Sequence, residues 1–275
     1  MDNGWPRTIL TALCIITCGL LGLLAARFAV GTRGVVAPAI LDAASPAMAG
    51  VAVLACLGAA VVIATSLAKP INAAVSLFAI GCGVAAFAMR SGNVNEAVFQ
   101  GANFRWLGAE TLVWGVATAL VSVIVFRVGG PLPDVPPADP EQTFVQGMLR
   151  PRALLSLLAA LAAPAVLAFT LVGASKGQSI GACSLAGVAA AVGARLIAAN
   201  EQPILIFAAP VIVIGIAQLV LAGQVGGALD ASFASGSLNP ILCAMPADVA
   251  AGSLCGVAAG LGWSKGLVKP TEEAA

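Results

Sequence analysis

Charged side chains inside or beside apolar runs are the residues with which this chain could do chemistry. Arg195 lies within such a run, shortly before Asn200. An ionisable group at this depth in a membrane helix is a functional hypothesis, because an unpaired charge in hydrocarbon is costly. The alternative is that the long side chain carries its guanidinium group back to the nearby membrane surface. We therefore treat Arg195 as a candidate binding residue and keep this surface position as the alternative.

Two acidic residues each stand at the start of an apolar run. Glu110 begins the run that ends at Val128, and Asp248 begins the run that ends at Gly262. A carboxylate in the first turn of a helix is stabilised by the helix dipole, so helix capping is one interpretation of both residues. The other interpretation is an ion or substrate site near the outer mouth of a membrane bundle.

The segments that precede these two acids are unusually long and polar. Arg90 to Gly108 mixes apolar residues such as Phe99 with polar ones, which predicts a short interfacial helix. Ala222 to Pro246 is rich in small and hydroxyl residues and contains Asp230 and Asn239, which we add to the candidate binding residues. We expect surface loops here. The alternative is re-entrant, site-forming loops, whose backbone would need a cover of protein or water.

Residue types that usually carry catalysis or hold metals are missing. The sequence has no His, its seven Cys lie mostly inside apolar runs without CxxC spacing, and no phosphate-binding, dinucleotide, zinc-protease or nucleophile-elbow motif stands in a suitable context. We interpret the Cys as small apolar residues and expect no metal, no cofactor and no catalytic site. A membrane enzyme would have to draw its acid and base from Glu96, Glu110, Asp230 or Asp248.

Composition identifies the elements that must position these candidates. Hydrophobic residues make up 60% of the 275 residues, charged residues make up 9%, and the mean hydropathy is +1.02. Soluble domains carry about 25% charged residues, so this chain has far too few charged side chains to cover its surface in water. The apolar surface must therefore face a lipid bilayer. Continuous apolar runs predict spanning helices, whereas barrel strands would alternate. A net charge of +1 indicates no nucleic-acid partner.

The apolar runs predict an all-α membrane protein with eight spans. The fourth and eighth runs are the least regular, because each begins with an acid and the eighth is short. The predicted spans are Thr8 to Val30, Ala47 to Ala68, Ile71 to Met89, Ala109 to Val128, Ala153 to Val172, Ile180 to Ala199, Pro203 to Leu221 and Ala247 to Gly262.

The eight spans fall into two tandem halves. A proline-rich linker at residues 131–150 separates residues 1–130 from residues 151–275, and Pro6-Arg7-Thr8 matches Pro151-Arg152-Ala153. Further short matches follow in the same order, with similar loop lengths, so we predict two four-helix repeats related by an axis along the membrane normal. Chance similarity between Ala-rich helices is the alternative.

Lys and Arg predict the orientation. They are more frequent at span ends on the side that holds both termini and the linker around Pro133, which places that side in the cytoplasm. We therefore expect an integral protein of a bacterial inner membrane with both termini inside.

Two functions remain open. Gly252, Gly256 and Gly260 form one small-residue helix face, where close helix packing is expected. With that face, and without an expected buried carboxylate, the chain suits a non-catalytic subunit of a membrane complex, with membrane-protein partners or a homo-oligomer. The alternative is a small-solute or ion transporter with its site between the repeats, in which Asn72, Gln218 and Thr118 would supply neutral contacts.

Overall fold

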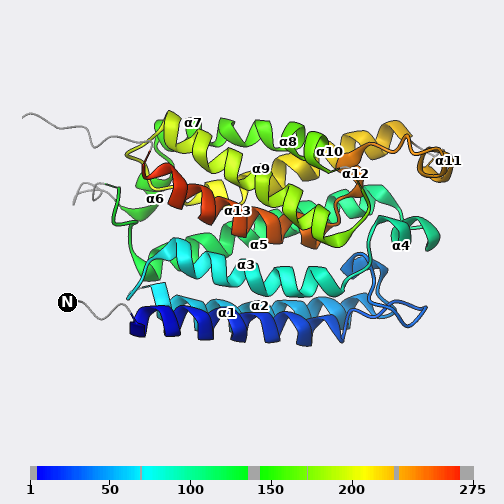
Figure 1. The fold of residues 1–275 in the computed structure, drawn as a ribbon, viewed down its shortest axis with the longest axis horizontal. Coiled ribbons are helices and arrows are strands. Elements are labelled where there is room, and N and C mark those ends of the chain that lie inside the picture. The colour runs from blue at the N-terminus through cyan, green and yellow to red at the C-terminus, as the bar shows by residue number, and fades with distance from the viewer. Residues whose placement is uncertain (1–4, 69, 136–142, 172, 226–228, 267–275) are drawn as a thin grey trace, which may run out of the picture.

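A computed structural model describes residues 5–68, 70–135, 143–171, 173–225 and 229–266, and these form a bundle of long helices (Figure 1). Of the residues that the structure describes, 77% are helical. In the described ranges, extended pairing is limited to one isolated antiparallel bridge between Val30 and Val36. The predicted all-α class is confirmed. The predicted linker is described only up to residue 135 and again from residue 143.

Four long helices and two short ones make up the first half. Asparagine side chains accept backbone N–H groups at three helix starts: Asn72 from Val75, Asn93 from Asn95 and Glu96, and Asn103 from Arg105, as expected of N-caps. The elements are α1 (Trp5–Ala26), η1 (Ile40–Asp42), α2 (Pro46–Ala68), α3 (Ala73–Arg90), α4 (Val94–Phe99) and α5 (Phe104–Gly129).

The second half is more interrupted. Its first long helical stretch, residues 151–170, changes to a 3-10 helix before Pro164. Pro164 stands in the first turn of the following α-helix and has no N–H with which to continue an α-helix from the preceding residues. The elements are α6 (Phe144–Met148), α7 (Pro151–Ser156), η2 (Leu157–Ala162), α8 (Ala163–Thr170), α9 (Lys176–Ile197), η3 (Leu205–Phe207), α10 (Ala209–Val225), α11 (Leu229–Ala234), α12 (Pro240–Cys243) and α13 (Pro246–Ser264).

Seven helical stretches in the described ranges are long and apolar enough to cross a membrane, which indicates a polytopic membrane protein. α13 is not among them although it has 19 residues, because Gly, Ser and Asp248 lower its hydropathy. The seven are Pro6–Ala26, Pro46–Ser66, Ala73–Arg90, Phe104–Gly129, Pro151–Thr170, Lys176–Ile197 and Leu205–Val225.

α13 is the most enclosed helix of the bundle. It packs against α9 and α3, and most of its side chains are buried. α5 packs against α10. The third long helix of each half, α3 or α10, therefore contacts the fourth long helix of the other half, α13 or α5. Within the halves the packing differs, because α1 packs closely on α3 whereas α9 packs closely on α13.

The connections gather at two ends of the bundle. Figure 1 shows the N-terminal side and α6 at one end, and α4, α11 and α12 at the other. We call the first the linker end, which includes residues 130–135 and 198–204. We call the other the loop end, which includes residues 27–45, 91–103 and 235–245. The charged candidates are divided between these two ends.

Candidate functional site

A pocket at the loop end is built from both halves of the chain. Its volume is about 390 Å³, which is large enough for a small solute. The first half contributes the connection after α1, the end of α3 and the start of α4, and the second half contributes the start of α9. The lining residues are Val35, Val36, Arg90, Ser91, Gly92, Asn93, Asn95, Glu96, Phe99 and Lys176.

Backbone contacts hold the first-half wall of this loop-end pocket. Gly92 donates its N–H to the carbonyl oxygen of Ala37 at 3.2 Å, and a Cβ at Gly92 would meet the nitrogen of Pro38 at 3.0 Å. The connection after α1 and the end of α3 therefore approach closely only because residue 92 is glycine. Arg33 adds a bond from its guanidinium group to the carbonyl oxygen of Phe99 at 2.8 Å.

Lys176 forms the second-half wall. Its side chain is 11% exposed, and its Nζ lies 2.8 Å from Oδ1 of Asp248, which is buried. Oδ2 of Asp248 accepts from the Ser179 hydroxyl at 2.7 Å and from the Met245 N–H at 3.3 Å. Both carboxylate oxygens are thus occupied. An ammonium group has three N–H donors, and Asp248 takes one, so Lys176 keeps donors for a ligand in the pocket that it lines.

The pocket presents more donors than acceptors. Arg90 is exposed, and no ion pair of it occurs among the described residues. Asn93 uses its side-chain oxygen to cap α4, which leaves its NH₂ group as a donor. The acid in the lining, Glu96, lies 3.4 Å from the Gln100 amide. Asp248 neutralises Lys176, so the pocket offers the charge of Arg90, the remaining N–H donors of Lys176 and the Asn93 amide against the carboxylate of Glu96. This excess of donors fits a small solute with an anionic group.

Glu110 lies apart from the lining of this pocket and does not act as an ordinary cap. It is 6% exposed, and its two oxygens accept the N–H groups of Ile40 and Leu41 at 3.0 and 3.1 Å. Those donors belong to η1, not to the first turn of α5. Asp248 does bond its own helix start through Met245. The expectation of no buried carboxylate was wrong, because folding encloses the starts of α5 and α13 that the sequence places near span ends.

Arg195 lies at the linker end, opposite the pocket. It is 2% exposed, donates to the carbonyl oxygen of Ala199 at 2.8 Å, and forms an ion pair with Asp134. Lys265 lies 3.6 Å from the other oxygen of Asp134. A counter-ion from the linker therefore meets Arg195 at the C-terminal end of α9, where the guanidinium group is buried by protein.

The other predicted residues have local roles. Asp230 is exposed on α11, and Asn239 caps α12 by accepting the N–H of Ile241 at 3.0 Å. The three glycines of α13 face α9 within the chain. A Cβ at Gly252 or Gly256 would meet residues 183 and 184, and one at Gly260 would meet Val188. This face is therefore filled by α9 and is not open to a partner protein.

Two neutral candidates, Gln218 and Thr118, are buried inside the bundle, and the third, Asn72, caps α3. Gln218 accepts from the Thr111 hydroxyl at 2.6 Å and donates to the carbonyl oxygens of Ile241 and Ala244 at 3.1 and 2.7 Å. Thr118 is buried in α5. Sequence reasoning had used Lys176 and Arg90 only for orientation. Their position directly at span ends, Lys176 after the serine cap of α9 and Arg90 shortly before the asparagine cap of α4, was the signal for the pocket.

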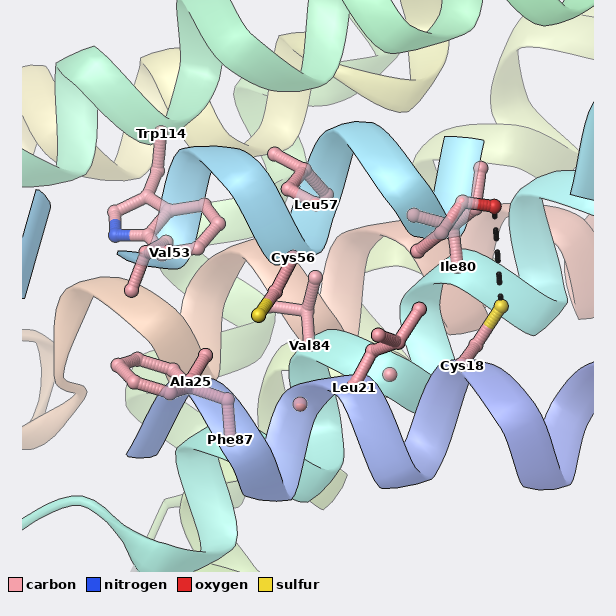
Figure 2. Close-up of a pocket in the computed structure, with 13 residues that line it drawn as sticks. Cys18, Leu21, Ala25, Val53, Cys56, Leu57, Ile80, Val84, Phe87 and Trp114 are labelled. Carbon is pink, nitrogen blue, oxygen red and sulfur yellow. Dashed lines mark hydrogen bonds between the residues drawn. The ribbon is translucent and has the colours of Figure 1, made fainter. Parts of the chain in front are cut away.

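A second, smaller cavity lies between α1, α2 and α3 (Figure 2). Its volume is about 30 Å³ and its lining is almost wholly apolar, including Leu21, Phe87 and Trp114. Cys18 contributes a weak bond from its Sγ to the carbonyl oxygen of Ala60 at 3.9 Å. Small apolar cavities of this kind stay dry, so we assign no polar ligand to it.

Comparisons with known proteins give no relatives: no family model, no curated protein and no solved structure matches this chain. Its function is therefore inferred from the geometry of the described residues.

Proposed function

We propose that this protein is an eight-span membrane protein that binds a small anionic solute in the loop-end pocket and carries it across the membrane. One observation carries the proposal. The pocket takes its walls from both halves, and its second-half wall is a nearly buried ammonium group fixed by Asp248.

The eighth span of this proposal is α13. Its 19 residues give a length of about 28 Å at 1.5 Å per residue, close to the roughly 30 Å of a hydrocarbon core. Its low hydropathy suits a helix that other helices enclose, since few of its side chains meet lipid. The reciprocal contacts of α3 with α13 and of α5 with α10 are those that a two-fold axis between two four-helix repeats would give.

Transport is favoured over simple binding because the ligand would bridge the two halves. Movement of one half against the other would separate Arg90 from Lys176 and so change the affinity of the pocket. α3 and α13 pack closely, for example where a Cβ at Gly81 would meet Leu254 at 2.8 Å. In the proposed transport cycle this close contact between the halves would keep the path toward the linker end closed.

Purified protein in liposomes tests the proposal with a panel of labelled small anions, namely phosphate, sulfate, short carboxylates and amino acids. We expect saturable uptake of one class. Arg90→Gln should weaken its apparent affinity about tenfold or more, because a charge-assisted hydrogen bond contributes about 1.5–3 kcal/mol. The matched control is Arg105→Gln, which removes another exposed arginine of the loop end that does not line the pocket.

Two outcomes would contradict the proposed transport function. Equal kinetics for Arg90→Gln and Arg105→Gln would remove the pocket from the mechanism. Absence of uptake together with co-purification of a partner in fixed stoichiometry would replace the transporter by a subunit of a membrane complex.

A further inference from the structure

A buried glutamine connects α5 and α10 to the segment that precedes α13. Gln218 of α10 is 2% exposed, and its NH₂ group donates to the carbonyl oxygens of Ile241 at 3.1 Å and Ala244 at 2.7 Å. Carbonyl oxygens only accept, so the amide oxygen must point the other way, where the Thr111 hydroxyl donates to it at 2.6 Å. That hydroxyl also lies 3.0 Å from the carbonyl oxygen of Leu107, but the amide oxygen is the nearer acceptor.

These hydrogen bonds lie inside the bundle and not at its rim. Gln218 stands about two helical turns before Val225, the last residue of α10, which is a depth of about 10 Å. Thr111 stands equally far after Phe104, the first residue of α5. The segment around α12, which lies beside α10 at the loop end (Figure 1), therefore dips into the bundle, and Gln218 satisfies two of its buried carbonyl groups.

Glycine contacts bring α5 and α10 close enough for the short bond between Thr111 and Gln218. A Cβ at Gly115, one turn after Thr111, would lie 2.7 Å from a side-chain atom of α10. A Cβ at Gly215, one turn before Gln218, would lie 2.9 Å from a side-chain atom of α5. Close packing on both helices therefore fixes the position of the Gln218 amide.

The peptide unit between Ala244 and Met245 connects this glutamine to the loop-end pocket. Its carbonyl oxygen accepts from Gln218, and its N–H donates to Oδ2 of Asp248 at 3.3 Å. A peptide unit is planar and rigid, so the direction of its C=O sets the direction of its N–H. Oδ1 of the same carboxylate lies 2.8 Å from Nζ of Lys176. A continuous chain of hydrogen bonds therefore runs from α5 to the ammonium group that lines the pocket.

We propose that Gln218 is a positioning residue of the loop-end pocket, which fixes the ammonium group of Lys176 through the peptide unit 244–245 and Asp248. Gln218 is not part of the pocket lining, so it acts on a solute only through the lysine. Thr111 belongs to the first half and Lys176 to the second, so a shift of α5 against α10 reaches the second-half wall of the pocket. The effect on solute affinity rests on the proposed function, whereas the position of Lys176 does not.

A simpler role for Gln218 would be to satisfy two buried carbonyl groups and nothing more. Ser122 of α5 has such a role, because its buried hydroxyl donates to the carbonyl oxygen of Ile204 at 2.5 Å, at the linker end. Thr111→Val and Ser122→Ala therefore form a matched pair. Each removes a buried hydroxyl of α5 and leaves an acceptor without its donor, so both should lower stability. Only Thr111→Val should affect the pocket.

Acetylation of the purified protein by acetic anhydride, quantified at each lysine by mass spectrometry, reports the position of Lys176 without any solute. Lys265, whose side chain is 47% exposed at the linker end, serves as the internal reference. Gln218→Ala should free the ammonium group and speed the acetylation of Lys176 relative to Lys265 at least about twofold, the lower end of coupling within one hydrogen-bond network. Thr111→Val should act in the same direction, and Ser122→Ala should leave the ratio unchanged.

Two results of this labelling would overturn the proposal. A folded Gln218→Ala protein with the wild-type ratio would leave Gln218 with the two carbonyl groups as its only role. If Gln218→Ala does not fold, the same ratio in Thr111→Val has the same meaning. Equal acceleration in Thr111→Val and Ser122→Ala would show that general loosening of the bundle, and not the chain of hydrogen bonds, exposes Lys176.

Uptake of labelled phosphate, sulfate, short carboxylates and amino acids separates this proposal from the proposed function. Gln218→Ala should weaken the apparent affinity when Lys176 is present and leave it unchanged in a Lys176→Met background. An equal loss in both backgrounds would refute the route through the lysine. If no anion is taken up although the acetylation of Lys176 responds to Gln218→Ala, the proposed function fails and the positioning of Lys176 stands.

Discussion

A very close approach of α9 and α13 gives a test of the packing. A Cβ added at Gly256 of α13 would overlap the carbonyl oxygen of Ser184 and lie 2.9 Å from its Cα. These are backbone atoms of α9, so no side-chain rotation relieves the overlap. Gly262 lies on the same helix, and a Cβ there would meet nothing within 4 Å. Gly256→Ala and Gly262→Ala therefore form a matched pair.

The expected magnitude follows from two opposing effects. Alanine in place of a helical glycine gains about 0.5–1 kcal/mol of backbone entropy at either position. Overpacking of a close-packed interior costs about 1–3 kcal/mol, with the upper end expected when rigid backbone must move. Gly256→Ala should lose about 1–2 kcal/mol and Gly262→Ala should be neutral or slightly stabilised, a difference of about 2 kcal/mol. Gly256→Leu should separate the two helices outright.

Unfolding by SDS in mixed micelles, followed by circular dichroism, measures this difference in the isolated chain. The Gly256→Ala midpoint should fall to a lower SDS fraction than that of Gly262→Ala. Equal midpoints would refute the close packing of α9 and α13. Normal stability of the isolated Gly256→Ala chain with loss of a co-purifying protein would instead place the face at a partner.

Three further predictions follow from other contacts. Asp248→Asn should destabilise the protein by about 3–5 kcal/mol in the same assay, because it strands the buried ammonium group of Lys176, whereas Glu201→Gln, in a more exposed pair with Arg150 at 3.7 Å, should cost less than about 1 kcal/mol. The thiols of Cys82 and Cys255 contact each other between the halves, so oxidation by copper-phenanthroline should form a disulfide between them. After cleavage at a protease site inserted into residues 136–142, this disulfide should keep the two halves joined in the wild type and not in Cys82→Ser. In a variant without native cysteines, an impermeant thiol reagent outside intact cells should label Ala234→Cys and miss Val145→Cys; the reverse pattern would invert the orientation.

Local sequence predicted the helices well, because apolar runs and their caps are properties of neighbouring residues. The predicted runs Ala47 to Ala68 and Ala109 to Val128 lie within α2 and α5 and needed no tertiary information, although α5 begins five residues earlier, at Phe104. α13 marks the limit of this reasoning. Its glycines predicted close packing by their spacing, but spacing does not say which helix fills the face. Only the fold reveals that Ser184 and its neighbours on α9 do so.

The candidate site was less predictable, because its contacts join residues far apart in the chain. Glu110 looks like a helix cap in sequence, yet its donors are the N–H groups of Ile40 and Leu41, 70 and 69 residues away. Lys176 carried information only about orientation until Asp248 was placed beside it. The chemical type of the residues therefore predicted some members of the candidate site, such as Asp248. Which residues pair with each other depended on how the long helices pack.

The two buried cations of α9 meet their counter-ions at different times during synthesis. Asp134 precedes Arg195 by 61 residues, so the acid has already left the ribosome when the arginine emerges. Lys176 must wait for Asp248, which follows it by 72 residues. When α9 is synthesised, the counter-ion of Arg195 is therefore already present and that of Lys176 is not, so the ion pair at the loop end forms only after α13 is made.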